Sequence, residues 1–282
     1  MMERFLIVTN DGKDTENAVT DQVTGLLGAA GKQCVLCKKD EHKKILKDSV
    51  PEEIDCAVVI GGDGSLIEVA RLFWDKAIPI LGINMGTLGY LTEVEVGGID
   101  EAVGQVVKGD YVLERRMMLE GTFTDPSGEK KSDVSLNDIV VSRKGELHII
   151  HFQLYVNGEL LNDYEADGVV LSTPTGSTAY NLSAGGPIVE PTASLIVVTP
   201  ICSHSLNTRS IVLSSEDEIE IAIGPGRNGS KEEVYVAFDG ADTVSLKTGD
   251  RVTVRRSDAS ATIMKLSKVS FLETLRRKMK GN

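Results

Sequence analysis

The feature that most constrains the fold is a series of short, continuous apolar runs in the first hundred residues. They are too short for helices and do not alternate with polar residues, which is typical of parallel strands buried on both faces. The runs are Phe5–Thr9, Gln33–Cys37, Ile54–Ile60 and Ile78–Ile83. Between them, Asp14–Ala30 and Leu66–Trp74 carry apolar residues at helical spacing. Strands that alternate with helices predict a doubly wound α/β domain over residues 1–110.

The period changes after about residue 110. In His148–Val156 apolar residues occupy every second position, and Asn157-Gly158 follows as a hairpin turn signal. The same alternation recurs in Ile219–Ile223, Glu233–Phe238, Arg251–Arg255 and Thr262–Leu266. Alternation buries one face of each strand, so we predict an antiparallel β-sandwich domain over residues 111–265. The amphipathic stretch Val269–Lys280 predicts a C-terminal helix, within residues 266–282, that docks onto an already folded part of the chain.

Composition and charge limit the class of protein. Of the 282 residues, 41% are hydrophobic and 26% are charged, which is typical of globular proteins. No run of about 18 apolar residues and no signal-peptide pattern occurs, so we expect a cytoplasmic protein without a membrane partner. The net charge of −12 argues against a nucleic-acid partner, and Arg276–Lys280 is interpreted as a solvated helix face. Cys34 and Cys37 form a lone C-x-x-C in an apolar stretch, which favours buried thiols over a zinc or redox site.

The motif Gly61-Gly62-Asp63-Gly64-Ser65 directly follows a buried strand and precedes a helix. In α/β sheets, ligands bind at the carboxyl ends of the strands. Gly61, Gly62 and Gly64 let a ligand approach the main chain, and the N–H groups at a helix start suit phosphate. Ser65 is a candidate cap for the helix. The motif is not a Walker A loop, and a plain glycine-rich turn is the alternative interpretation.

Asp63 stands out because a carboxylate inside a phosphate-binding loop repels the phosphate. Two roles explain such a residue: it holds a divalent metal ion, or it accepts a proton from an alcohol that attacks phosphorus. The chain's G-x-G-x-x-G pattern, Gly224–Gly229, lies between two alternating strands and contains Pro225. We therefore interpret that pattern as a hairpin loop and not as a dinucleotide-binding fingerprint.

Three further segments carry groups that suit a nucleotide. Residues 82–91 follow a strand and contain Asn84, which can form hydrogen bonds, and Tyr90, which either stacks on a ring or packs in the ordinary way. Asn137-Asp138 supplies an amide and a carboxylate, which suit a ribose diol or an ordinary turn. Residues 167–187 run from a strand into a loop dense in serine and threonine, whose hydroxyl and N–H groups bind anions without cations.

The histidines do not indicate a metal site. His148 and His151 are three residues apart on an alternating strand, which places them on opposite faces. His204 follows another strand, and for all three we expect an ordinary, hydrogen-bonded histidine.

Together, these motifs resemble those of the NAD kinases, which phosphorylate the 2′-hydroxyl of the adenosine ribose of NAD to give NADP. They occur in the family's order over roughly residues 55–240: Gly61–Ser65, Gly86–Leu91, Asn137-Asp138, Asp167–Pro187, Pro200–Leu206 and Asp239-Gly240. The resemblance implies an α/β domain, a β-sandwich domain and a terminal helix that packs back on the first domain. It also implies a homodimer or homotetramer that uses a divalent metal, with Mg²⁺ expected, and ATP or polyphosphate as phosphoryl donor.

The resemblance further implies roles for individual residues. Asp63 is expected to accept the proton of the 2′-hydroxyl, and the loop of Gly61, Gly62, Gly64 and Ser65 to bind the phosphates of ATP. The residues expected to bind NAD are Asp63, Gly64, Tyr90, Asn137, Asp138, His148, Glu165, Asp167, Thr178, Ala179, Tyr180, Asn181, Leu182, Ser183 and Ala241. Three of these depart from the family's pattern: many bacterial relatives have Arg in place of Glu165, Glu is commoner than Asp138, and some relatives have an amide in place of Ala241. No metal ligand is assigned.

Two alternative functions stay open on sequence grounds. A lipid kinase of the diacylglycerol type shares the GGDG loop, although the chain lacks an exposed basic amphipathic helix beyond its short tail. A sensor that binds NAD(P) without turnover would keep the same fold. A hydride-transfer enzyme is disfavoured because the dinucleotide-binding fingerprint is missing.

Overall fold

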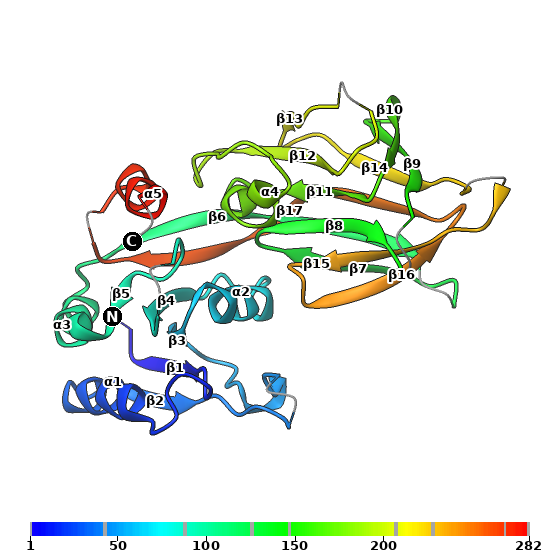
Figure 1. Ribbon diagram of the computed structural model, residues 1–282. Helices are drawn as coiled ribbons and strands as arrows, with labels where there is room; N and C mark the ends of the chain where they lie inside the picture. The colour runs from blue at the N-terminus through cyan, green and yellow to red at the C-terminus, as the bar shows by residue number, and fades with distance from the viewer. Residues whose placement is uncertain are drawn as a thin grey trace. The chain divides into compact units, whose positions relative to one another are not determined.

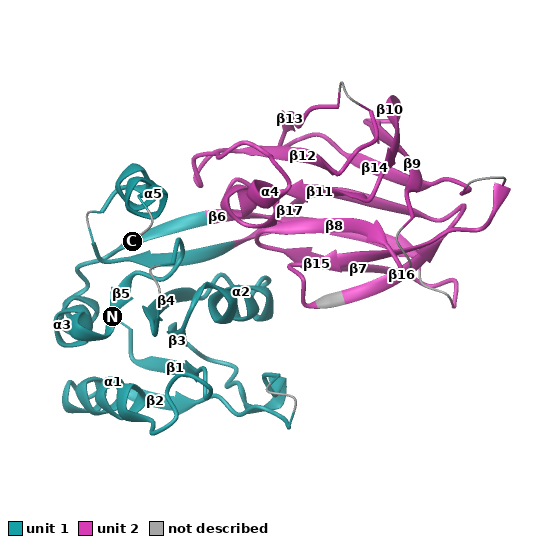
Figure 2. Ribbon diagram, in the orientation of Figure 1, with its two compact units in different colours: residues 1–115, 261–282 teal, residues 116–260 magenta. Residues whose placement is uncertain are grey.

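A computed structural model describes residues 2–41, 44–86, 89–124, 127–145, 148–205, 208–226, 229–267 and 269–280 (Figure 1). The chain divides into two compact units (Figure 2). The first comprises Met1–Arg115 and Ala261–Asn282, and the second comprises Arg116–Ser260. No helix among the described residues has both the length and the hydropathy needed to cross a bilayer.

The first unit is built on a parallel sheet in the order β2-β1-β3-β4, with the end of β17 beside β4. Its elements are β1 (Arg4–Thr9), α1 (Ala18–Ala29), β2 (Gln33–Leu36), β3 (Cys56–Gly61), α2 (Asp63–Leu72), β4 (Pro79–Asn84), β5 (Val94–Glu95), α3 (Ile99–Lys108) and α5 (Phe271–Met279). Every residue of β3 is buried, as expected for a central strand of a parallel sheet. The predicted α/β domain and C-terminal helix are confirmed.

The helices α1 and α2 do not begin at the residues that the apolar spacing predicts. The helix expected from Asp14 begins at Ala18, because the Asp14 carboxylate accepts hydrogen bonds from the N–H groups of Val19 and Thr20 and so holds the chain entering the helix. The helix expected from Leu66 begins at Asp63, directly after the glycine pair. The glycine loop is therefore shorter than its sequence suggests, and the last three of its five residues are helical.

The second unit contains two antiparallel sheets. One has the order β10-β9-β14-β17, built from β9 (Ile150–Val156), β10 (Glu159–Ala166), β14 (Ile219–Ile223) and the first part of β17 (Arg251–Lys265), and β6 (Val112–Thr124) and β7 (Lys130–Ser135) also belong to it. The other has the order β13-β12-β11-β8-β15-β16, built from β8 (Asp138–Arg143), β11 (Gly168–Ser172), β12 (Leu195–Ile201), β13 (Ile211–Ser214), β15 (Glu233–Phe238) and β16 (Asp242–Lys247). The predicted β-sandwich is confirmed.

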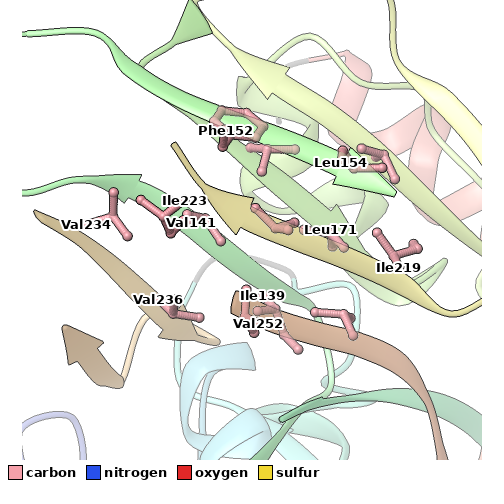
Figure 3. Close-up of a cluster of buried hydrophobic side chains, with 14 of the residues drawn as sticks. Ile139, Val141, Phe152, Leu154, Leu171, Ile219, Ile223, Val234, Val236 and Val252 are labelled. Atoms are coloured by element: carbon pink, nitrogen blue, oxygen red, sulfur yellow. The ribbon is translucent and has the colours of Figure 1, made fainter. Parts of the chain in front are cut away.

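Alternate residues of these strands form one core (Figure 3). Phe152 on β9 and Tyr164 on β10 stack with their ring centroids 5.2 Å apart. The turn between these two strands is Asn157-Gly158, with φ angles of 50° and 82°, so the hairpin predicted there is present.

Two other predictions concern the loops and strands at the end of this unit. Two strands are predicted at Arg251–Arg255 and Thr262–Leu266, but the structure has a single strand there, β17, which ends at Lys265 and whose ends pair with different neighbours. The chain between them stays extended as part of β17. The Gly224–Gly229 pattern lies between β14 and β15, as predicted, but the predicted hairpin is wrong, because β14 and β15 belong to different sheets and the loop connects these sheets. Arg227 and Asn228 are outside the described residues.

Candidate active site

The glycine motif of the first unit connects β3 to α2. Gly61 ends the strand, Gly62 is the N-cap residue in an extended conformation, and Asp63 is the first residue of the helix. The expected cap is wrong, because Ser65 lies inside the helix and its hydroxyl is 3.4 Å from the side-chain amide nitrogen of Asn10. The first N–H groups of α2 have no intrahelical partner, as at any helix start, which leaves this end suited to an anion.

The Asp63 carboxylate is held by a second loop of the same unit. Its Oδ2 atom accepts a hydrogen bond from the N–H of Tyr90 at 2.7 Å. Its Oδ1 atom accepts from the N–H groups of Leu91 and Thr92, both at 3.1 Å, and from the Thr92 hydroxyl at 3.3 Å. Because a carboxylate offers about four acceptor positions, Oδ2 keeps one for a further donor.

The loop that holds Asp63 approaches the carboxylate with its bare backbone at Gly89. A Cβ atom on Gly89 would lie 2.0 Å from Asp63 Oδ1 and 2.4 Å from the Thr92 hydroxyl oxygen, so no other residue fits there without moving one of them. The neighbouring motif residues Thr87 and Leu88 are outside the described residues. Asn84, a candidate ligand group, is buried and donates its side-chain N–H to the carbonyl of Gly86 at 2.9 Å.

Tyr90 is half-buried, and its ring faces a cation of the C-terminal helix. The ammonium nitrogen of Lys278 lies 4.3 Å from the ring centroid. Burial, and then the negative charge of Asp63, raise the pKa of the Tyr90 hydroxyl above its ordinary value. Tyr90 thus contacts Asp63 through its backbone N–H and Lys278 through its ring.

Sequence reasoning missed Lys13. Its ammonium nitrogen lies 3.2 Å from the position that a Cβ atom would take on Gly62, and 3.4 Å from that position on Gly86. Within the described residues this ammonium has neither a hydrogen-bond acceptor nor an ion-pair partner. A signal was available, since Lys13 follows β1 at the carboxyl edge of the sheet, where β3 also ends in the glycine motif.

In the second unit, Asn137 and Asp138 are held at the start of β8 by Asp239. The Asp239 carboxylate accepts hydrogen bonds from the N–H groups of Leu136, Asn137 and Asp138 at 2.8, 2.8 and 3.1 Å. Asp239 and Gly240 form the turn from β15 to β16, with φ angles of 50° and 68°, and the exposed Ala241 follows them. This turn therefore fixes the backbone of the Asn137-Asp138 pair.

The side chains of this pair are available to a ligand. Neither the Asn137 amide nor the Asp138 carboxyl makes a hydrogen bond within the described residues. Asp138 is 5% exposed. Burial, and then the negative charge of Asp239, raise the pKa of the Asp138 carboxyl to about 7. Near neutral pH a large fraction of Asp138 is therefore protonated and can donate a hydrogen bond.

The loop after β11 is fastened to the same pair. Thr173 donates its N–H to the Asn137 carbonyl at 2.8 Å and its hydroxyl to the Leu136 carbonyl at 2.6 Å. A Cβ atom on Gly176 would lie 2.1 Å from the Asn137 carbonyl oxygen, so the two backbones are in direct contact. The loop continues through a short 3₁₀ turn, Thr175–Thr178, and the single helical turn α4 (Tyr180–Ser183).

Several polar side chains of this loop form hydrogen bonds within the protein, whereas Thr178 and Ser183 keep their side chains accessible. Ser177 donates to the carbonyl of Pro174 and accepts from the N–H of Val189. The Asn181 side chain is fully buried, donates to two carbonyl groups and accepts from the Thr199 hydroxyl at 2.7 Å. The buried Asn181 side chain thus stabilises the loop. The residues on the accessible side are Thr178, Ala179, Tyr180, Leu182 and Ser183.

A cavity of about 750 Å³ in the second unit brings the other predicted residues together. It is lined by ionisable side chains: His148, His151, Glu165, Asp167, His204 and Glu232. The predicted separation of His148 and His151 is wrong, because β9 begins at Ile150 and His148 precedes it. Among the described residues, no group of three or more His, Cys, Asp or Glu side chains is arranged to hold a metal ion. Leu206, which ends the Pro200–Leu206 motif, is outside them.

Carboxylate partners hold the basic groups in and beside this cavity. His148 Nε2 lies 2.7 Å from Glu232 Oε2, and His151 Nε2 lies 2.5 Å from Asp163 Oδ1. Arg143 Nε lies 3.4 Å from Asp167 Oδ1.

The candidate NAD residues of this unit therefore form two groups. One group lies at the end of the β8–β11 strand pair where Asp138 pairs with Ser172, and it consists of Asn137, Asp138 and the loop after β11. The other group includes Asp167, which directly precedes the opposite end of this strand pair, where Gly168 pairs with Ser142. The two ends are four residue steps apart along the strand, which is about 13 Å. A dinucleotide, with its two riboses joined through a pyrophosphate, is an extended ligand of a kind that two such groups can hold.

Comparisons with known proteins identify the family. A sequence model described as "ATP-NAD kinase N-terminal domain" matches residues 4–111, and one described as "ATP-NAD kinase C-terminal domain" matches residues 136–266. A protein of Lachnospira eligens named NAD kinase is 44% identical over 99% of this chain and 100% of its own length. One of Agathobacter rectalis, also named NAD kinase, is 41% identical over 100% of this chain and 99% of its own.

Two solved structures share the fold. The crystal structure of yeast NADH kinase complexed with NADH has a TM-score of 0.87 and 23% identity, covering 100% of this chain and 88% of that one. An NAD kinase from Archaeoglobus fulgidus in complex with ATP has a TM-score of 0.79 and 24% identity, covering 98% of each chain. Because both domain models match and relatives above 40% identity span the whole chain, the chain belongs to the NAD kinase family.

Proposed function

We propose that this chain transfers the γ-phosphoryl group of ATP to the 2′-hydroxyl of the adenosine ribose of NAD, with Asp63 as proton acceptor. The observation that carries the assignment of Asp63 is its carboxylate, which four donors from Tyr90–Thr92 hold at the start of α2 with one acceptor position left on Oδ2. A carboxylate fixed in this way suits the orientation of an attacking hydroxyl group.

In this reaction the 2′-oxygen forms a bond to the γ-phosphorus while the bond to the bridging oxygen of ADP breaks. The hydroxyl proton passes to Asp63, and ADP leaves with the electron pair of the broken bond. The protein contributes by positioning the reactants and by stabilising the charge of the transition state, as in other phosphotransferases.

The donor phosphates are assigned to the glycine motif and to Lys13. Gly61, Gly62, Gly64 and Ser65 offer bare backbone and helix-start N–H groups. The ammonium of Lys13, which has no ion-pair partner in the described part of the chain, lies over Gly62 and Gly86. Mg²⁺ would enter with ATP on its phosphates, since Mg²⁺ in kinases is held largely by phosphate and water.

NAD is assigned to the two residue groups of the second unit. The amide of Asn137 and the carboxyl of Asp138 bind a ribose diol, because together they offer both donors and acceptors. The accessible side of the adjoining loop is also assigned to NAD, and it consists of Thr178, Ala179, Tyr180, Leu182 and Ser183. His148, Glu165 and Asp167 bind the other part of the dinucleotide. We also expect a homodimer or homotetramer in the cytoplasm.

The direct test supplies purified protein with Mg²⁺, either NAD or NADH, and either ATP or polyphosphate, and measures NADP(H) with an NADP-specific dehydrogenase. NADP formation from NAD and ATP is the expected result. Tight NAD binding without product from any donor would instead indicate a sensor. Phosphorylation of diacylglycerol in vesicles, with no product from NAD, would support the lipid-kinase alternative, which none of the matches reported above favours.

A further inference from the structure

The C-terminal segment contacts the loop that holds Asp63 at two points, Tyr90 and Glu93. From these contacts we infer that Lys278 is a positioning residue for Asp63, acting through Tyr90. This inference rests on the proposed role of Asp63 as proton acceptor.

The first contact joins Lys278 to the donor closest to Asp63. The ammonium nitrogen of Lys278 lies 4.3 Å from the Tyr90 ring centroid, well within the range of a cation–π interaction. The N–H of the same tyrosine makes the shortest of the four hydrogen bonds to the carboxylate, at 2.7 Å. Because the ring and this N–H belong to the same residue, the contact with Lys278 restrains a residue that supplies a donor to Asp63.

The second contact fixes the other end of the loop. Glu93 has a side chain that is only 4% exposed, forms an ion pair with Lys265 and accepts a hydrogen bond from the N–H of Ser267 at 2.7 Å. Its own N–H donates to the Gly82 carbonyl of β4 at 2.9 Å. Leu91 and Thr92, which supply the remaining donors to Asp63, lie between these two anchored residues.

The two anchors differ in strength. Glu93 is tied to the sheet and to the end of β17, whereas Lys278 lies on α5, a helix without one fully buried residue. Leu272 and Met279 of this helix are 68% and 75% exposed. With so little apolar burial holding α5, the interaction of Lys278 with Tyr90 is a main link between this helix and the Asp63 loop.

The inference predicts an effect on turnover and little effect on binding. Lys278→Met removes the cation but keeps the length of the side chain, and we expect kcat to fall about two- to five-fold, the range that an exposed cation–π interaction supplies. The KM for ATP should stay within about twofold, because within the described residues Lys278 contacts neither the glycine motif nor Lys13. Lys278→Arg should restore kcat, since guanidinium also binds aromatic faces.

The experiment compares these variants with Lys280→Met, which removes a neighbouring exposed cation without a ring contact, and with Tyr90→Leu. If Lys278 acts through the ring, Lys278→Met lowers kcat in the wild-type background but not in Tyr90→Leu. Equal thermal unfolding midpoints identify a variant as folded, and Lys278→Arg carries the test if Tyr90→Leu does not fold.

Wild-type kcat in Lys278→Met, or an equal loss in Lys280→Met, would overturn the inference. If Asp63 is not the proton acceptor, Asp63→Asn retains turnover whatever the Lys278 variants do. That result distinguishes a failure of the proposed role of Asp63 from a failure of the inference about Lys278.

Discussion

Asp138 is predicted to lower the stability of the folded protein above neutral pH, so Asp138→Asn should stabilise it there. Burial and the nearby charge of Asp239 raise the pKa of Asp138 from 3.8 to about 7. Between about pH 4 and pH 7 the folded protein therefore holds a proton on Asp138 that the unfolded chain has lost. This proton favours folding at pH 4 and below, and the advantage is lost as the pH rises through about 7.

The size of the effect follows from the shift. A pKa unit corresponds to about 1.4 kcal/mol, so raising the pKa from 3.8 to about 7 costs the ionised folded state at most about 4 kcal/mol relative to the low-pH limit. Asparagine has a similar shape and no charge, and it removes this penalty. We expect Asp138→Asn to be more stable than the wild type by about 2–4 kcal/mol at pH 8, and by clearly less at pH 5.

Urea unfolding at pH 5, 6.5 and 8 measures the difference, with Asp110→Asn as the control. Asp110 is exposed and makes no side-chain hydrogen bond in the described residues, so its replacement removes one charge without relieving burial. A difference between Asp138→Asn and wild type that is absent at pH 8, or that does not change with pH, would refute the reasoning.

Two further predictions concern the first unit. Gly89→Ala places a methyl group 2.0 Å from Asp63 Oδ1, so it should displace the carboxylate and lower kcat about 100-fold in steady-state assays, while Gly104→Ala on α3, where a Cβ meets open space, should leave kcat unchanged. Lys13→Met should raise the KM for ATP by about 10- to 100-fold with little change in the KM for NAD, because one charge-assisted contact to phosphate is lost; equal KM values for ATP would remove Lys13 from the donor site.

Local patterns in the sequence were enough to predict the two kinds of sheet. Continuous apolar runs identified β1 and β3, and alternation identified β14 and β15, because burial on both faces and on one face leave different periods in the chain. The position of Asp63 after a buried strand was also predictable from the sequence. The turn at Asn157-Gly158 was predicted because both residues tolerate positive φ angles.

The contacts of the site were not predictable in this way, because they join distant parts of the chain. The donors to Asp63 lie 27 to 29 residues later, and Asp239 holds residues that precede it by about one hundred positions. No local period encodes such pairs. For the same reason the sequence does not reveal that the Asn181 side chain bonds to Thr199 and to two carbonyl groups.

The central claim is that Asp63 accepts the proton of the attacking hydroxyl, and Asp63→Asn tests it most directly. This variant keeps the size of the side chain but removes the base, and a positioned base typically contributes 10²–10⁴-fold to the rate. Single-turnover phosphorylation of NAD by MgATP, together with the Kd for NAD from calorimetry, separates chemistry from binding. We predict a rate loss in that range, about 3–5 kcal/mol, with a nearly unchanged Kd. Near wild-type turnover with NAD bound would contradict the account.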